Sequence, residues 1–367
     1  MKIQVIRPGE LDPQMMRRWL DLQSCNLALG SPFFSPAYVQ AVGESRDDTW
    51  VAVMEDGEGI AGFFPFQRRW GAGRPVGDWL SDHHGVIAAP HAQWDWTELL
   101  RASRLGFWQF DHLPASQRPP AGVASGCSPA LDLSAGFEAW RDRRIAAGGR
   151  RVAELPRKAR KLAREVGPLR FEADCRDPRV FATVLQWKSE QCRRTGARDC
   201  LGPAWTRELL ERIAAADQPQ LAGRLSALYA GDELVAAHFG MRSRTVWHWW
   251  FPVYSHAHAS YSPGALLLTE VAQAAAREGS QLLDLGKGDE SYKSSFADAA
   301  LPLLEGTVGR ESVATHLRAL RRGVGRWLRQ SPVAQPLRPM LRRIGRLQAL
   351  VIGSQLWWEL PELARLV

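Results

Sequence analysis

Two neighbouring stretches of the sequence decide the fold of its second half. Residues 246–264 read VWHWWFPVYSHAHASYSPG, and residues 283–293 read LDLGKGDESYK. The period-two alternation of the first stretch predicts a strand with two faces, one bearing Trp247, Trp249 and Phe251 and the other His248 and Trp250. These aromatic side chains belong either to the core or to a wall on which a sugar or acyl group stacks, with Trp249 as the substrate contact.

A helix is predicted to begin at the end of the first stretch. Ser262 can cap this helix, Pro263 suits its first turn, and Gly264 leaves room for a close approach. The first N–H groups of a helix lack internal partners and carry the positive end of its dipole, so they suit a pyrophosphate. The alternatives are a purely structural helix start and a cofactor site formed by Tyr261, Ser262, Pro263, Gly264 and Ala265.

The second stretch ends an apolar strand and then turns polar. Its glycines match neither the Rossmann nor the phosphate-loop spacing, yet dense polar residues after a strand are typical of a site at the strand's carboxyl end. Structural salt bridges explain the same residues equally well. The functional interpretation assigns Asp284 to substrate binding, Asp289 or Glu290 as general base, Tyr292 or Tyr261 as proton donor, and Lys287 and Lys293 as cations for a pyrophosphate.

The same order of elements is predicted for both halves of the chain. The first half reads as a strand at 3–6, helices at 13–29 and from 36, hairpin strands at 49–54 and 59–67, a helix at 94–103 and a strand at 105–110. The second half reads as a strand at 169–173, helices at 180–194 and 203–216, strands at 221–229, 233–242 and 245–254, a helix at 263–278, and strands at 281–285 and 303–309. This order predicts an α/β (α+β) fold with mixed, largely antiparallel sheets.

Composition places the domain boundaries. Residues 114–130 are rich in Pro, Gly, Ser and Ala, which predicts a linker or long surface loop, and helices are predicted at 134–145 and 151–165. The second of these helices carries a strongly basic face, for which simple solvation is the first explanation. The resulting division is a first domain at 1–113, a linker and connecting helix at 114–149, a second domain at 150–310 and an Arg-rich tail at 311–367.

The net charge of +8 on 367 residues is concentrated in the tail. Residues 311–367 hold ten Arg and three acidic residues, which leaves 37 basic and 36 acidic residues for the rest of the chain. A nearly neutral body does not support a nucleic-acid groove, so no nucleic-acid partner is expected. Apolar residues at helical spacing opposite arginines predict amphipathic helices over 312–352, which either pack on the body or attach it peripherally to an anionic membrane or a partner.

Cysteines and histidines give weaker indications. The five cysteines are odd in number and widely spaced, and the sequence shows neither an apolar run of about 18 residues nor a signal-peptide pattern, so we expect reduced thiols and a cytoplasmic location. Asp82, His83 and His84 either line a cleft between the domains, with the two histidines as substrate contacts, or are solvated. They lack a spaced third ligand, so no metal is expected. His256 and His258 are further candidates for the base.

A family resemblance rests on three motifs: WKSEQCRRTG at 187–196, YSPG at 261–264 and the polar run at 284–293. Together they resemble the GNAT-related acetyltransferases of the cellulose-biosynthesis (CelD/BcsL-like) type. That group is related to the Fem-type peptidyl transferases, which carry two GNAT-like domains. The resemblance covers about 150–310, and the first 113 residues fit a degenerate N-terminal GNAT-like half. The Arg/Gln-x-x-Gly-x-Gly/Ala loop common in GNAT proteins is absent, and YSPG stands in its place.

The resemblance implies two tandem GNAT-like domains and an N-acyltransferase. The donor would be acyl-CoA, most simply acetyl-CoA, and the acceptor an amine on a sugar, nucleotide-sugar or exopolysaccharide precursor. Transfer would be direct, without a metal or a covalent intermediate. The first motif adds Lys188, Gln191 and Arg194 as substrate contacts. The alternatives are Fem-like aminoacyl transfer from charged tRNA, which needs a basic surface, and a non-catalytic subunit of a polysaccharide synthase complex docked through the tail.

Overall fold

The computed structural model divides the chain into two units after residue 310, and all of the described residues belong to the first unit. The structure describes residues 1–117, 119, 123–196, 199–288 and 290–309. The predicted tail helices at 312–352 therefore lie outside the described residues, and so does the predicted base Asp289. Within the described part, no helix is both long and apolar enough to cross a membrane.

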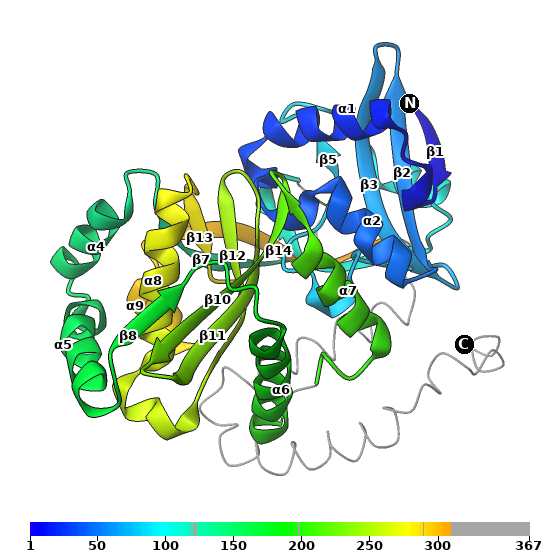
Figure 1. Cartoon of the computed structure of the whole chain (residues 1–367). Coiled ribbons are helices and arrows are strands. Elements are labelled where there is room, and N and C mark those ends of the chain that lie inside the picture. The colour runs from blue at the N-terminus through cyan, green and yellow to red at the C-terminus, as the bar shows by residue number, and fades with distance from the viewer. Residues whose placement is uncertain (118, 120–122, 197–198, 289, 310–367) are drawn as a thin grey trace, which may run out of the picture. The chain divides into compact units, whose positions relative to one another are not determined.

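The first half of the described unit combines short helices with a twisted set of strands (Figure 1). Side-chain caps set where the helices begin: Asp12 accepts hydrogen bonds from the N–H groups of Gln14 and Met15, and Ser35 accepts one from Ala37. The elements are β1 (Lys2–Ile6), α1 (Pro13–Ser24), α2 (Pro36–Ser45), β2 (Thr49–Asp56), β3 (Gly59–Arg69), β4 (Ala72–Arg74), β5 (Ile87–Ala88), α3 (Trp96–Ala102) and β6 (Phe107–Pro114).

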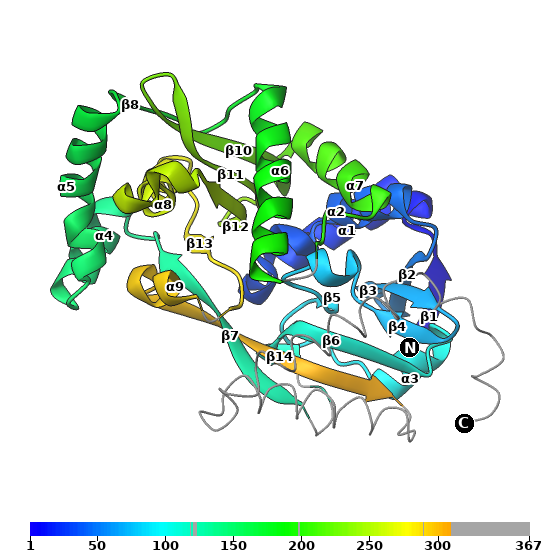
Figure 2. The same cartoon turned by 90° about the horizontal axis from the view of Figure 1, so that it is seen from below.

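The second half holds the longest of the described helices. Its elements are β7 (Ala124–Asp132), α4 (Phe137–Ala146), α5 (Arg150–Glu165), β8 (Leu169–Glu172), α6 (Pro178–Thr195), α7 (Ala204–Ala215), β9 (Asp217–Gln218), β10 (Leu221–Ala230), β11 (Glu233–Arg242), β12 (Val246–Tyr254), α8 (Pro263–Arg277), β13 (Leu282–Asp284), α9 (Ser291–Phe296) and β14 (Ala299–Gly309). Buried side chains of α4, α5 and α8 share one hydrophobic cluster, and those of α6 and α7 belong to another. Figure 2 shows α5 and α6 on either side of the second-half strands.

The strands of both halves join one continuous mixed sheet. Their order is β1-β2-β3-β4-β6-β14-β7-β13-β12-β11-β10-β8, with β5 on β3 and β9 on β10. Among the described strands, only β4 with β6 and β12 with β13 pair in parallel. The predicted mixed, largely antiparallel α/β class is therefore confirmed.

The prediction of a linker at 114–130 is wrong for its second part. Residues 124–132 form β7, which pairs with β14 on one side and β13 on the other. Its small residues carry little strand propensity of their own, so pairing on both edges, rather than local sequence, makes it a strand. Since β14 also pairs with β6, a strand late in the sequence connects the two halves. The domain boundaries themselves stay a prediction.

A bulge changes the predicted alternation of β12. Phe239 of β11 lies opposite Phe251, but Met241 lies opposite His248, so two residues of β12 face one of β11. As a result Phe251 packs in the same cluster as Trp250, with ring centroids 4.6 Å apart, rather than with Trp247 and Trp249. The single-face assignment of Phe251 is corrected accordingly.

Replacing Leu131 by Ala tests the new position of β7. Its side chain is fully buried in β7, so Leu131→Ala should lower the free energy of unfolding by about 2–5 kcal/mol through lost contacts and the cavity left behind. Leu27→Ala is the matched control, because Leu27 is 90% exposed, and it should change stability by less than about 0.5 kcal/mol. Urea denaturation measures both. Equal and small losses of stability in the two variants would mean that residues 124–132 form a surface loop.

Candidate functional site

Parallel strands β12 and β13 part at the centre of the second half. Their pairing joins Val246–His248 to Leu282–Asp284 and ends there, while β12 runs on to Tyr254. His248 and Asp284 are thus the last paired residues before the strands separate. A gap between diverging parallel strands exposes backbone N–H and C=O groups along β12, which a ligand can use as it would a strand edge.

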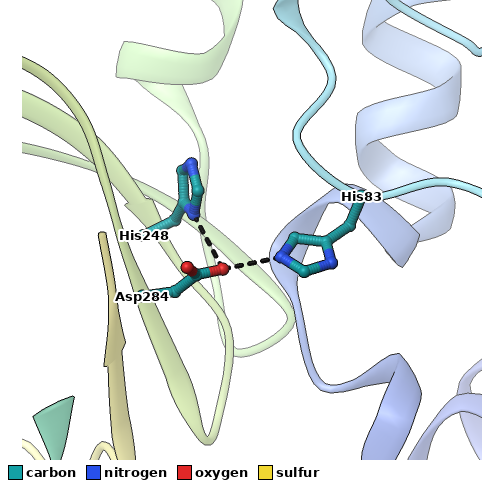
Figure 3. A group of neighbouring side chains, drawn as sticks. All are labelled: His83, His248 and Asp284. Carbon is teal, nitrogen blue, oxygen red and sulfur yellow. Dashed lines mark hydrogen bonds and ion pairs between the residues drawn. The ribbon is translucent and has the colours of Figure 1, made fainter. Parts of the chain in front are cut away.

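The Asp284 carboxylate collects partners from separate parts of the chain (Figure 3). Its Oδ2 lies 2.6 Å from His83 Nε2 and 3.2 Å from His248 Nδ1, the second being an ion-pair contact without hydrogen-bond alignment. Its Oδ1 accepts hydrogen bonds from Ser128 Oγ and from the Gly286 N–H. Because these partners come from a first-half loop, from β12 and from β7, both halves of the described unit build the site.

His248 carries a buried positive charge at neutral pH. Burial opposes the charged form, but the neighbouring Asp284 and Asp82 raise the pKa of His248 to about 9. Its Nε2 lies 2.8 Å from Asp82 Oδ2. Burial alone would raise the pKa of Asp284, yet His248 and His83 hold it well below its usual range. The arrangement is therefore an imidazolium held between two carboxylates.

His83 meets one carboxylate, whereas both ring nitrogens of His248 lie beside carboxylates. The His83 Nε2 is hydrogen-bonded to Asp284, and among the described residues no hydrogen bond is made to its Nδ1. A carboxylate that accepts the Nε2–H fixes the tautomer in which Nδ1 carries the lone pair. The Asp284–His83 pair therefore has the form of a general base with its orienting carboxylate.

His84 is a structural neighbour of this pair. Its Nε2 accepts hydrogen bonds from the N–H groups of Asp111 and His112, at 3.2 and 3.0 Å. Burial lowers the pKa of His84 to about 3, so it is neutral. Two groups bring together atoms of the kind that bind metal ions: His83 with His248 and Asp284, and His84 with Asp111 and His112. The sequence offered no third ligand near His83 and His84. The structure brings His248 and Asp284 of the second half beside His83.

The polar run after β13 is folded on itself. Lys293 is buried, and its Nζ donates to the carbonyls of Gly286 and Lys287 at 3.0 and 3.2 Å and pairs with exposed Glu290 at 3.0 Å. Lys287 Nζ lies 2.5 Å from Glu305. Burial raises the pKa of Tyr292, which packs against the α8 cluster. The predicted phosphate cations are thus both held by the protein's own oxygens.

The start of α8 is open at one amide. Ser262 adopts a left-handed conformation (φ 57°) and does not cap the helix with its side chain, whose Oγ accepts instead from Lys158 Nζ at 2.6 Å. The N–H of Ala265 donates to the Ser262 carbonyl, and Pro263 has no N–H, which leaves Gly264 as the open donor of this turn among the described residues. Tyr261 donates its hydroxyl to Glu165. The basic helix α5 thus supplies a cation beside this helix start.

A separate pocket lies between α6 and the end of β12. It has a volume of about 270 Å³ and is lined by Trp187, Glu190, Gln191, Arg194, Val253, Tyr254, Ser255 and His256. The predicted residues Gln191, Arg194 and His256 therefore meet in one place. Lys188 lies beside it, with its Nζ bonded to Gln191 at 3.2 Å. Trp249 does not line the pocket, because it is buried and stacks on His238 in the core.

Two residues of the central cluster, His248 and Ser128, were not selected from the sequence, whereas Asp82 was named together with His83. A histidine in a strand otherwise made of large apolar residues was the available signal for His248. Ser128 had none, since its segment was predicted to be a linker.

Comparison with known proteins connects this geometry to a family. Residues 149–294, which include α5, β12, α8 and β13, match the model of the acetyltransferase (GNAT) domain. This stretch is a GNAT-type acetyltransferase domain. The chain is therefore an acyltransferase enzyme, as the resemblance implied. No curated protein matches it in sequence.

Solved structures extend the likeness to the described first half. The C-terminal domain (DUF2156) of a putative lysylphosphatidylglycerol synthetase from Agrobacterium fabrum superposes with a TM-score of 0.51 at 14% identity, covering 85% of this chain and 97% of that one. FemX gives 0.51 at 8% identity, with 84% and 96% covered. A tandem GNAT protein from the clavulanic acid biosynthesis pathway gives 0.45 at 12%, with 85% and 100% covered. These likenesses concern the fold alone, and the predicted GNAT-type α/β fold is confirmed, while the division into two tandem GNAT-like domains stays a prediction.

The buried charge of His248 in the GNAT domain predicts how stability depends on pH. A pKa near 9 in the folded protein, against about 6.5 when unfolded, gives a stabilising contribution that is complete below about pH 6.5. This contribution, on the order of 3 kcal/mol, is lost as the pH rises through 9. Thermal unfolding between pH 6 and 10 should therefore show a falling melting temperature, and His248→Gln should flatten that fall. An identical slope in both proteins would contradict the assigned charge.

Proposed function

We propose that the chain transfers an acetyl group from acetyl-CoA to an amine, and that the reaction takes place where β12 and β13 part. The observation that carries this proposal is the end of strand pairing at His248 and Asp284, directly beside the Asp284–His83 pair. Of the described residues, these are the ones that combine an open strand edge, a buried ionic cluster and an imidazole nitrogen without a partner.

The donor would lie along the open edge of β12. From His248 to Tyr254 the strand rises about 20 Å, which suits an extended phosphopantetheine arm whose amides bond to the strand edge. At the far end of the strand, the open Gly264 N–H and the Lys158 ammonium beside Ser262 suit the pyrophosphate. The thioester would then reach the parting point.

At the parting point, His83 would act as general base. An ammonium acceptor must lose a proton before its nitrogen can attack the thioester carbonyl. His83 Nδ1 would accept that proton, with Asp284 holding the opposite nitrogen and stabilising the imidazolium that forms. The C–N bond forms, the C–S bond breaks, and the thiolate leaves and takes up a proton. The His248 charge would remain paired with Asp82 and Asp284.

The acceptor we propose is an amine on a sugar, nucleotide-sugar or exopolysaccharide precursor, as the CelD/BcsL-like resemblance implies. The reaction would take place in the cytoplasm, where the five free thiols stay reduced. A peripheral attachment through residues 311–367 belongs to the same proposal, with a membrane or a synthase complex as the partner.

One observation favours Fem-like transfer from charged tRNA as a second candidate. Arg150, Arg151, Arg157 and Arg160 of α5 have no ion-pair partner among the described residues, and α5 lies beside the start of α8. A row of unpaired cations suits a polyanion longer than two phosphate groups. Residues 1–310 are nearly neutral overall, with 37 basic and 36 acidic residues, so within this part of the chain the α5 surface would have to bind the donor alone.

A donor screen separates these candidates. Acetyl-CoA at about 100 times its dissociation constant should stabilise the protein by about 2.7 kcal/mol, visible as a raised melting temperature, whereas charged tRNA should leave the melting temperature unchanged. Stabilisation by charged tRNA alone would favour the Fem-like reaction. No response to either donor would favour a non-catalytic subunit and overturn the proposal.

Replacing the proposed base tests the mechanism. His83→Gln should lower kcat by about 10²–10⁴-fold in acetyl transfer to whichever amino sugar turns over fastest, while the Kd for acetyl-CoA stays the same. His258→Gln is the matched control, because His258 pairs with Glu233 at 2.8 Å, away from the cluster, and its turnover should equal that of the unchanged protein. If His83→Gln turned over at the full rate, His83 would not be the general base.

A further inference from the structure

The reaction proposed above gives no role to the side chains that line the pocket between α6 and the end of β12. Two aromatic rings, Trp187 and Tyr254, form part of its lining, and the Arg194 guanidinium has no carboxylate partner among the described residues. Glu190, the pocket's acidic residue, accepts a hydrogen bond from Gln186 at 2.9 Å. The pocket therefore offers aromatic faces together with a guanidinium that forms no ion pair with a described carboxylate, which suits a flat ring linked to an anion.

The pocket is continuous with the start of α8. The Tyr254 ring lies against Gly264, where an added Cβ would come within 3.3 Å of it, and its centroid is 5.1 Å from that of the His256 ring. Gly264 is the residue with the open N–H in the first turn of α8. A ligand that places a pyrophosphate at this turn therefore has the pocket within reach of its next group.

Position and size decide between donor and acceptor. The pocket is lined by residues 253–256, so it lies about 20 Å along β12 from the parting point, and a group bound there cannot touch the thioester carbon. A volume of about 270 Å³ is at the small end for ligand pockets and suits one ring system rather than a whole glycan. An acceptor must reach the thioester, whereas the far end of a long donor must not.

We propose that this pocket binds the adenosine 3′-phosphate end of a coenzyme A donor, with the base between the aromatic rings and Arg194 on the 3′-phosphate. This assignment rests on the proposed function. Under this assignment Gln191, Arg194 and His256 bind the nucleotide end of the donor. Sequence analysis had instead predicted Gln191 and Arg194 as substrate contacts and His256 as a candidate base. The donor would then span β12 from the pocket, past Gly264, to His83.

The test compares acetyl-CoA with its 3′-dephospho analogue by isothermal titration calorimetry. The full chain should bind the dephospho analogue about 10-fold or more weakly, because a charge-assisted contact is lost. Arg194→Gln should weaken the binding of acetyl-CoA by the same factor and leave the affinity for the dephospho analogue unchanged. Arg193→Gln is the matched control, since Arg193 is the exposed neighbour on α6 outside the pocket lining, and it should bind like the unchanged protein.

The possible outcomes separate the two proposals. Equal affinities for both donors, together with an unaltered Arg194→Gln variant, would overturn the pocket assignment while leaving the acyl-CoA reaction in place. If Arg193→Gln lost as much affinity as Arg194→Gln, the effect would come from the overall charge of this surface and not from a contact in the pocket. That result would also overturn the pocket assignment. No binding of acetyl-CoA by the unchanged chain would instead remove the proposed function on which the assignment rests.

Discussion

A carboxylate without access to water needs partners, and Asp284 has them only because two halves of the chain meet around it. His83 comes from a loop of the first half, His248 from the neighbouring strand, and Ser128 from β7. Removing one partner of a buried charge costs several kcal/mol, because the remaining charge cannot be hydrated. The relative placement of the halves is therefore tied to the same group that defines the site.

The sheet topology explains why this group lies at the gap between β12 and β13. β13 is short and pairs with β12 over three residues before turning away, so its last residue lies at the bottom of the gap between them. On the other side β13 pairs with β7, and β7 with β14, which continues the sheet into the first half. The loop that carries Asp82 and His83 closes the site from that half. The site that we propose for catalysis therefore coincides with the junction of the halves.

Local signals in the sequence were sufficient for most elements and insufficient for those held by long-range pairing. The sequence predicted that the first two helices begin near residues 13 and 36, and it predicted strands at the positions of β10, β11 and β12. β7 was missed because its small residues become a strand only between β13 and β14, and α9 was missed because its polar residues read as part of a loop. The bulge in β12 depends on its pairing with β11, which no single strand reveals.

The site residues show the same difference between what local sequence predicts and what long-range contacts decide. Asp284 and His83 were selected as polar residues at a strand end and in a loop, but their direct contact joins positions 201 residues apart, which spacing cannot show. Lys287 and Lys293 were chosen for their charge, and the structure shows that nearby oxygens already hold both. The Gln191–Arg194 motif, in contrast, does line a pocket.

The most direct measurement is a crystal structure of the full chain with a thioether analogue of acetyl-CoA. Our account predicts the analogue in the gap between β12 and β13, with its acetyl group beside His83 and the Asp284–His83 contact intact. An acetyl group bound away from this gap, or halves arranged so that His83 no longer meets Asp284, would contradict it.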